Sequence, residues 1–227
     1  MPTRIRSGSA FAVIFDFDGT ILDSESAEFQ SHRRFFADHG VDLTTEEWCT
    51  CIGIVQPKSH WWDWLCARTA APPTYERFRA ATRGYFREYV RMEPMPGITA
   101  LVGALVAANV PIGVASAASS AWVIGALEEL GLAPSFGAVV TGDQIRLPKP
   151  APDVYQEAAR RLDTAPERCV AIEDSGPGLA AARAAGMRTV VVPHPLNRTH
   201  DFDGADLRLA SAADLTLDLL RELVNGR

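Results

Sequence analysis

Short apolar runs alternate with stretches of helical length along most of the chain. The first run, 11–15, is followed at once by Asp16-Phe17-Asp18-Gly19-Thr20. An apolar run of this length that ends at a glycine is typical of a strand buried on both faces of a parallel sheet. The same pattern predicts further strands at 111–115, 138–141, 169–172 and 189–192, and helices from 119 to 130 and at 153–162, 179–185 and 213–224. Such alternation predicts βαβ units around a parallel sheet.

The segment from 23 to 93 has a different pattern, with helices predicted near 27–39, 58–68 and 75–91. It contains most of the aromatic residues, including Trp48, Trp61, Trp62 and Trp64. Aromatic residues at helical spacing are typical of a domain core. The predicted fold is therefore α/β: a Rossmann-like, doubly wound parallel-sheet core formed by 1–22 and 94–227, with a small all-helical cap domain, 23–93, inserted into it.

Composition and charge limit the classes of partner. The 227 residues are 47% hydrophobic and 22% charged, which is ordinary for a globular protein. The formal net charge of −6 argues against a nucleic-acid or anionic-membrane surface. No run approaches the roughly 20 apolar residues of a membrane span, and the first apolar block is too short for a signal peptide. We therefore expect a cytoplasmic protein that binds neither nucleic acid nor membrane; a monomer is compatible with these features.

Polar residues follow the predicted strands at the edge of the sheet where open α/β sheets bind ligands. They are Asp16 and Asp18 after the first strand, Ser116 after the second, Lys149 on a later connection, and Glu173 and Asp174 after the strand at 169–172. Clustered carboxylates remain ionised only when a cation neutralises them, and oxygen ligands favour a hard cation such as Mg²⁺. The pattern predicts a phosphoryl-transfer site, with one aspartate as nucleophile and the other as general acid and base.

The same residues carry a family resemblance. Asp16-Phe-Asp-Gly-Thr20, Ser116, Lys149 and Glu173-Asp174 resemble the four motifs of the haloacid dehalogenase-like superfamily. The stretches Pro96-Gly97, Leu147-Pro-Lys-Pro-Ala-Pro-Asp153 and Ile172-Glu-Asp-Ser-Gly-Pro-Gly178 are similar to its subfamily with a helical cap between the first two motifs. The resemblance covers essentially the whole chain, strongly from 94 to 193 and weakly in the cap.

This resemblance implies a role for each motif. Asp16 would accept the phosphoryl group, and Asp18 would protonate the leaving group and then activate water. The phosphoryl group would be bound by Gly19, Thr20, Ser116, Ala117 and Lys149. A Mg²⁺ ion would be held by Asp16, by the backbone carbonyl of Asp18 and by Asp174, with Glu173 behind them or bound through water.

Each motif also has an ordinary structural interpretation when taken alone. Asp18-Gly19 is typical of a turn, Ser116 of a helix N-cap, and Lys149 of a solvated surface. The functional interpretation rests on their convergence at one edge of the sheet. A catalytically silent binding domain is the alternative from another class, and the complete set of acidic and basic residues argues against it.

Within the resembled superfamily, particular residues favour one activity. Dehalogenases and phosphonoacetaldehyde hydrolases lack the second aspartate, Asp18. The latter also need a lysine three residues after a cap glycine, whereas here Gln56 follows Gly53 at that spacing and Lys58 is two residues away. β-Phosphoglucomutase is the serious alternative, but it has an arginine at the position of Gln56 to hold a second phosphate. We therefore predict a Mg²⁺-dependent phosphatase of a small metabolite, such as a sugar phosphate or a phosphoglycolate-like compound.

Overall fold

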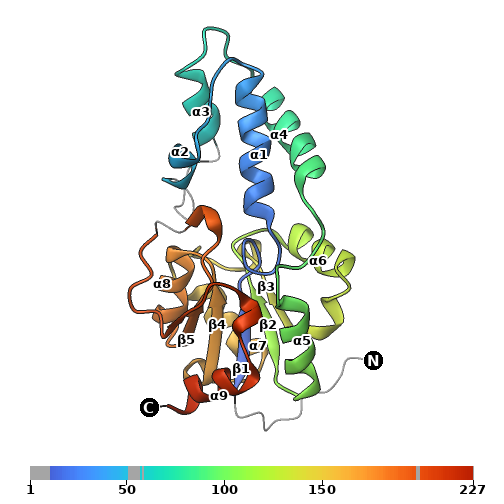
Figure 1. The fold of residues 1–227 in the computed structure, drawn as a ribbon, viewed down its shortest axis with the longest axis vertical. Helices are drawn as coiled ribbons and strands as arrows, with labels where there is room; N and C mark the ends of the chain where they lie inside the picture. Colours follow the sequence, from blue (N-terminus) through green and yellow to red (C-terminus); the bar gives the residue numbers. More distant parts are fainter. Residues whose placement is uncertain (1–10, 51–56, 58, 198–199, 227) are drawn as a thin grey trace. The chain divides into compact units, whose positions relative to one another are not determined.

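The computed structural model describes residues 11–50, 57, 59–197 and 200–226 (Figure 1). Its centre is a six-stranded sheet in the order β3-β2-β1-β4-β5-β6. The strands are β1 (Ala12–Phe15), β2 (Ile112–Ala115), β3 (Ala138–Val140), β4 (Cys169–Glu173), β5 (Arg188–Val191) and β6 (Leu207–Arg208). All neighbouring strands are parallel. The predicted α/β, doubly wound architecture is confirmed.

The strand order reverses at β1, which pairs with β2 on one side and β4 on the other. Phe15 lies opposite Val114 of β2 and opposite Ile172 of β4. The carboxyl ends of these three strands therefore meet at one edge. This reversal is the place where open α/β sheets bind their ligands.

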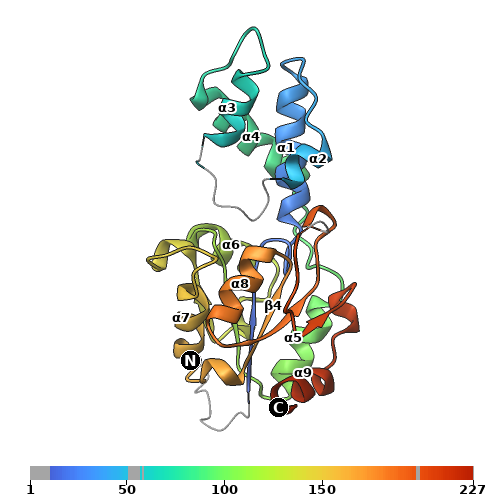
Figure 2. The same cartoon turned by 90° about the vertical axis from the view of Figure 1, so that its left-hand side faces the viewer.

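Helices cover both faces of the sheet, and Figure 2 shows the sheet nearly edge-on between them. α7 (Asp153–Arg161) and α8 (Gly176–Ala184) lie on one face, while α5 (Ile98–Ala107) and α9 (Leu217–Asn225) lie on the other. Buried side chains of α7 and α8 pack with those of the central strands; they include Val154, Tyr155, Ala158, Ala181 and Ile14. α6 (Ser120–Glu129) follows β2 directly.

Three elements of this unit differ from the sequence-based expectation. The predicted helix at 213–224 begins only at Leu217, because Thr216 caps it by accepting from the N–H of Leu219. α5 was not predicted, since apolar residues on all its sides leave no helical period. The two-residue β6 is too short to produce an alternating pattern.

The chain divides into two compact units. Among the described residues, one unit comprises 11–22, Met92–His194 and 200–226. The other unit comprises Asp23–Arg91 and 195–197. The predicted helical domain, 23–93, differs from this division in two places. Met92 and Glu93 group with the sheet unit, and the residues directly after His194 group with the helical unit. The short 3₁₀ turn Pro195–Asn197 groups with the helical unit because Leu196 packs against its aromatic core.

The helical unit contains α1 (Ser24–Ala37), α2 (Thr45–Cys49), α3 (His60–Cys66) and α4 (Tyr75–Tyr89). Its core is aromatic, and Trp48 stacks on Trp61 with ring centroids 4.7 Å apart. The members of the core include Phe29, Phe35, Phe36, Trp48, Leu65 and Phe78, with Trp61, Trp62 and Trp64 packed against them. Among the described residues of the whole chain, no helix is long and apolar enough to cross a membrane.

Candidate active site

The loop after β1 is a tight turn that brings two carboxylates to the edge of the sheet. The N–H of Asp16 donates to the carbonyl of Ile172, at 2.9 Å, which joins the loop to β4. Gly19 has a φ of +84°, and a Cβ built there would lie 2.3 Å from Oδ2 of Asp174. Only glycine accommodates both the positive φ and this close approach. The first loop therefore packs directly against the end of β4.

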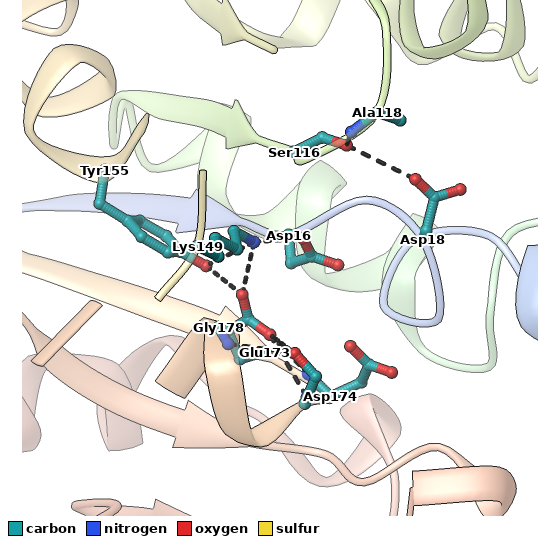
Figure 3. Close-up of polar contacts among 10 residues, drawn as sticks. Asp16, Asp18, Ser116, Ala118, Lys149, Tyr155, Glu173, Asp174 and Gly178 are labelled. Carbon is teal, nitrogen blue, oxygen red and sulfur yellow. Dashed lines mark hydrogen bonds and ion pairs between the residues drawn. The ribbon is translucent and has the colours of Figure 1, made fainter. Parts of the chain in front are cut away.

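Lys149 lies between two buried carboxylates (Figure 3). Its Nζ donates to Oδ1 of Asp16 at 2.5 Å and to Oε1 of Glu173 at 2.6 Å. The side chains of Lys149, Asp16 and Glu173 are only 8%, 9% and 0% exposed. One ammonium thus serves two carboxylates, and the buried cluster has an excess of negative charge.

Burial and this charge excess shift the titration of the cluster. Burial raises the pKa of Asp16 from its ordinary 3.8 to about 7, and the neighbouring Glu173 adds to the rise while Lys149 opposes it. Burial would lower the pKa of Lys149, but the attraction of Asp16 and Glu173 outweighs it and holds this pKa above its usual value. Lys149 is therefore charged at neutral pH. A second cation beside Asp16 would lower the pKa of Asp16 and favour its carboxylate form.

Glu173 supports the cluster from within the core. Its Oε1 accepts hydrogen bonds from Lys149 and, at 2.5 Å, from Oη of Tyr155. Its Oε2 accepts from the N–H groups of the next two residues and from Oγ of Ser175. A Cβ on Gly178 would lie 1.9 Å from the same carboxylate, so the first turn of α8 also approaches it closely. Both oxygens of Glu173 are thus already engaged by donors.

Asp16, Glu173 and Asp174 form a group of buried carboxylates that could hold a metal ion. One oxygen from each lies within 4.8 Å of the others. Three oxygen donors with a single neighbouring ammonium fit a hard divalent cation. Because the oxygens of Glu173 are occupied, Asp16 and Asp174 are the better ligands. The placement of Glu173 behind the metal ligands, or bound through water, stays a prediction.

Asp18 and Ser116 lie on the other side of the site (Figure 3). Ser116 is buried at the end of β2, where its N–H donates to the carbonyl of Val140. Its Oγ accepts from the N–H of Ala118 at 3.0 Å and lies 3.5 Å from Oδ2 of Asp18. The indole Nε1 of Trp122 donates to Oδ1 of Asp18 at 2.9 Å. Asp18 therefore has polar contacts with Ser116 and Trp122, and its charge adds to the rise in the pKa of Asp16.

The arrangement brings a buried carboxylate, an ammonium, a hydroxyl and a second carboxylate to one sheet edge, which is the equipment for phosphoryl transfer. The family model described as haloacid dehalogenase-like hydrolase matches residues 13–192. The chain belongs to this family.

Relatives of this haloacid dehalogenase-like hydrolase include proteins named as phosphatases. "Putative phosphatase YhcW" from Bacillus subtilis (strain 168) is 34% identical over 217 residues, covering 95% of this chain and 98% of the relative. Beta-phosphoglucomutase from the same organism is 31% identical, with coverages of 93% and 94%. The prediction of a hydrolase of this family is confirmed.

Solved structures agree with this assignment. CbbY from Rhodobacter sphaeroides in complex with phosphate is 31% identical, has a TM-score of 0.72 and covers 92% of this chain and 98% of its own. A mutant of CbbY in complex with xylulose-(1,5)bisphosphate gives the same TM-score and coverages at 30% identity.

Other predicted residues of this hydrolase lie close by or outside the described ranges. Thr20 is buried, and its hydroxyl has no hydrogen-bond partner among the residues that the structure describes. Ala117 is exposed beyond β2, and its carbonyl lies 2.2 Å from a Cβ built on Gly142. The argument against a mutase rests on Gly53 and Gln56, and the argument against a phosphonoacetaldehyde hydrolase also uses Lys58; these positions lie outside the described residues.

Two residues that touch the site were not predicted. Tyr155 looks from the sequence like an apolar core position of α7, because it lies beside Val154 and one turn before Ala158. Its hydroxyl nevertheless reaches Glu173. Trp122 lies in the first turn of α6, directly after the Ser116 loop. In both cases the available signal was an aromatic residue with a polar tip close in sequence to one of the predicted motifs.

Proposed function

We propose that this chain is a Mg²⁺-dependent phosphatase that hydrolyses a phosphate monoester of a small metabolite through an aspartyl-phosphate on Asp16. The observation that carries the proposal is the position of Lys149. Its ammonium lies in the buried cluster against Asp16, at the switch point of the sheet, while Asp18 lies across the site. A buried carboxylate beside a fixed cation suits an attack on a negatively charged phosphoryl group.

In the first step, a carboxylate oxygen of Asp16 forms a bond to phosphorus, and the bond from phosphorus to the leaving oxygen breaks. Asp18 gives its proton to that oxygen, so that an alcohol departs. Lys149 offsets the charge of the transferring group, and Ser116 Oγ and the N–H of Ala117 offer donors to its oxygens. A bound Mg²⁺, held by Asp16 and Asp174, would supply further positive charge at the phosphoryl oxygens and favour the ionised form of Asp16.

In the second step, Asp18 acts as a base. It takes a proton from a water molecule whose oxygen attacks phosphorus, and the bond between phosphorus and Asp16 breaks. Inorganic phosphate leaves, and the carboxylate of Asp16 is restored. Asp18 donates a proton in the first step and accepts one in the second. It therefore ends the cycle protonated and can donate to the next leaving group.

Sugar phosphates are the substrate class that the relatives support best. The CbbY structure with xylulose-(1,5)bisphosphate and the match to beta-phosphoglucomutase both concern phosphorylated sugars. We place the substrate of this chain among small phosphorylated sugars or phosphoglycolate-like acids. We also place the enzyme in the cytoplasm, on the basis of its composition.

A phosphosugar mutase is the second candidate. It is favoured by the 31% identity to beta-phosphoglucomutase over 220 residues. Both activities would begin with transfer to Asp16, and they differ in whether water or a sugar hydroxyl receives the phosphoryl group. Gln56 stands where a mutase would hold its second phosphate with an arginine, and this favours the phosphatase.

A panel of phosphate monoesters tests the proposal. Phosphate release is measured with Mg²⁺ and with EDTA, and β-glucose 1-phosphate is included with a coupled assay for glucose 6-phosphate. We expect metal-dependent phosphate release from one or a few sugar or acid phosphates, and none from the Asp16→Asn variant. Glucose 6-phosphate without free phosphate would identify a mutase instead. Binding of these compounds without turnover of any would indicate a silent domain.

A further inference from the structure

We propose that Trp122 positions the carboxylate of Asp18 for proton transfer to the leaving group. This rests on the proposed function, because the role of Asp18 as general acid belongs to it. The direct observation is the hydrogen bond from the indole Nε1 of Trp122 to Oδ1 of Asp18, at 2.9 Å. Both residues lie in the sheet unit, on α6 and on the loop after β1.

The indole ring contacts two successive residues of the first motif. Besides bonding Asp18, it packs edge-on against Phe17, with ring centroids 6.3 Å apart and planes at 84°. Phe17 is fully buried. The ring is therefore held on one side by the core while its N–H points at the carboxylate. Because an indole N–H only donates, Trp122 takes no part in the proton transfer itself.

The bond distinguishes the two oxygens of Asp18. Oδ1 is engaged by Trp122, whereas Oδ2 faces the Ser116 side of the site, 3.5 Å from Oγ of Ser116. Fixing one oxygen restricts rotation of the carboxylate about its Cβ–Cγ bond and leaves the other directed at the predicted phosphoryl site. The proton of the first step then passes from Oδ2 of Asp18 to the leaving oxygen, and the N–H of Trp122 keeps its proton.

α6 is itself held in place by a carboxylate of the next loop. Ser119 makes no side-chain capping bond, and Asp143 instead accepts from the N–H and Oγ of Ser120, at 3.1 and 2.8 Å. Hydrogen bonds from Thr141 and Ser120 lower the pKa of Asp143 to about 2, so it is ionised at neutral pH. An ionised carboxylate at a helix N-terminus is favourable. The first turn of α6, and Trp122 with it, is thus tied to the loop after β3.

A positioning role predicts a dependence on the leaving group. An alkoxide leaves poorly without a proton, so its departure depends on a correctly placed Asp18. A p-nitrophenolate leaves without protonation, so its departure does not. The parameter kcat/KM includes only steps up to the departure of the leaving group and excludes the later attack by water, in which Asp18 is also used.

The experiment compares Trp122→Phe with the wild type on p-nitrophenyl phosphate and on the alkyl phosphate that the wild type hydrolyses best. Phenylalanine keeps the ring packing and removes the N–H. We expect kcat/KM to fall about 10- to 100-fold on the alkyl phosphate and less than about 3-fold on p-nitrophenyl phosphate. Trp62→Phe is the matched control, since it removes an indole N–H that donates to the carbonyl of Pro73 in the helical unit. This control should change neither value.

A double variant sharpens the test. In an Asp18→Asn background, Trp122→Phe should cause little further loss on the alkyl phosphate, because the group that it positions is already absent. An equal loss on both substrates, no loss, a gain, or a fully additive loss in that background would overturn the positioning role. A wild type that hydrolyses neither substrate would overturn the proposed function, and this inference with it. If the wild type is active but Trp122→Phe lowers kcat/KM equally on both substrates, the inference alone is overturned.

Discussion

The two units of the chain bury different kinds of side chain. In the sheet unit, Asp16, Lys149, Glu173 and Asp174 are all buried at one edge of the sheet. In the described part of the helical unit, no Asp, Glu, Lys or Arg is buried, and aromatic rings fill the core. A buried charge cluster is costly to fold, whereas an aromatic core stabilises its unit. Buried charged groups that lower the stability of the fold are typical of functional sites, and here they lie at the edge of the sheet.

One buried titratable group in each unit makes the contrast concrete. His32 of the helical unit is buried among aromatic rings, and burial lowers its pKa from 6.5 to about 4. Its Nδ1 lies 2.9 Å from the carbonyl of Glu28. Lys149 is buried as deeply but keeps its charge, because two carboxylates face it. Burial thus favours the neutral form of His32 in the helical unit, whereas two charged partners keep Lys149 protonated in the sheet unit.

The largest effect is expected from the nucleophile. Asp16→Asn should lower the rate of phosphate release by at least about 10³-fold, because the amide cannot form the aspartyl-phosphate. Asp38→Asn in the helical unit is the control. Asp38 accepts from Oη of Tyr85 at an exposed site, and its replacement should leave the rate within about 3-fold. Near-normal turnover by Asp16→Asn would show that another group attacks phosphorus.

A second comparison removes one cation from each unit. Lys149→Met should lower activity about 10²- to 10³-fold and the free energy of unfolding by about 3–5 kcal/mol, because it leaves two buried carboxylates unpaired. Arg34→Met in the helical unit removes the partner of Glu88, an ion pair with both side chains largely exposed. It should change the free energy of unfolding by less than about 1 kcal/mol. Equal effects in urea denaturation would contradict the proposed difference between the units.

The pH dependence of stability should have opposite signs at the two buried groups when metal is removed with EDTA. The folded pKa of Asp16, about 7, lies above its unfolded value, so the folded state binds the extra proton and stability falls as pH rises from about 4 to 7. The folded pKa of His32, about 4, lies below its unfolded value, so stability falls as pH drops from about 6.5 to 4.

Two variants separate these contributions. Asp16→Asn should be more stable than the wild type by about 1–3 kcal/mol near pH 8, and this gain should shrink toward about pH 5. His32→Asn should reduce the loss of stability on the acid side. Thermal denaturation followed across this pH range measures both, and a destabilised Asp16→Asn at pH 8 would show that the ion pair with Lys149 outweighs the cost of burial.

The smallest expected effect is the difference in stability between two variants that each remove one tyrosine hydroxyl. Tyr155→Phe removes a buried donor to Glu173 and should lower the free energy of unfolding by about 1–2 kcal/mol and the activity several-fold. Tyr85→Phe removes an exposed donor to Asp38 and should cost less than about 0.5 kcal/mol. Chemical denaturation of both variants gives the comparison. A smaller cost for Tyr155→Phe than for Tyr85→Phe would mean that the buried network does not depend on this hydroxyl.

The sequence predicted those parts of the fold and site that follow from strand ends. Asp16, Ser116 and Asp174 come directly after buried strands, and parallel packing brings such ends to one edge whatever their separation in the chain. Tyr155 and Trp122 could not be predicted in this way. Their polar tips reach the site because of how α7 and α6 are docked, and side-chain spacing within a helix does not encode that docking. The catalytic roles of these residues remain predictions.

The helical unit shows the same limit. Its aromatic core follows from the spacing of Phe29, Phe36 and Trp61, which the pattern indicates. The five-residue α2 was not predicted, because it is too short to show a helical period. The packing of Leu196 against this unit could not be foreseen either, since this residue lies more than a hundred positions away in the chain.

The most direct test of the account is to trap the phosphoryl group on the protein. The purified chain is mixed with Mg²⁺ and a radiolabelled phosphate monoester identified by the panel, quenched in acid within milliseconds, and digested for peptide mapping. We predict an acid-stable, base-labile label on the peptide that contains Asp16, absent from the Asp16→Asn variant. Turnover of the substrate with the label on another residue, or with no labelled protein at any quench time, would contradict the assignment of Asp16 as the nucleophile.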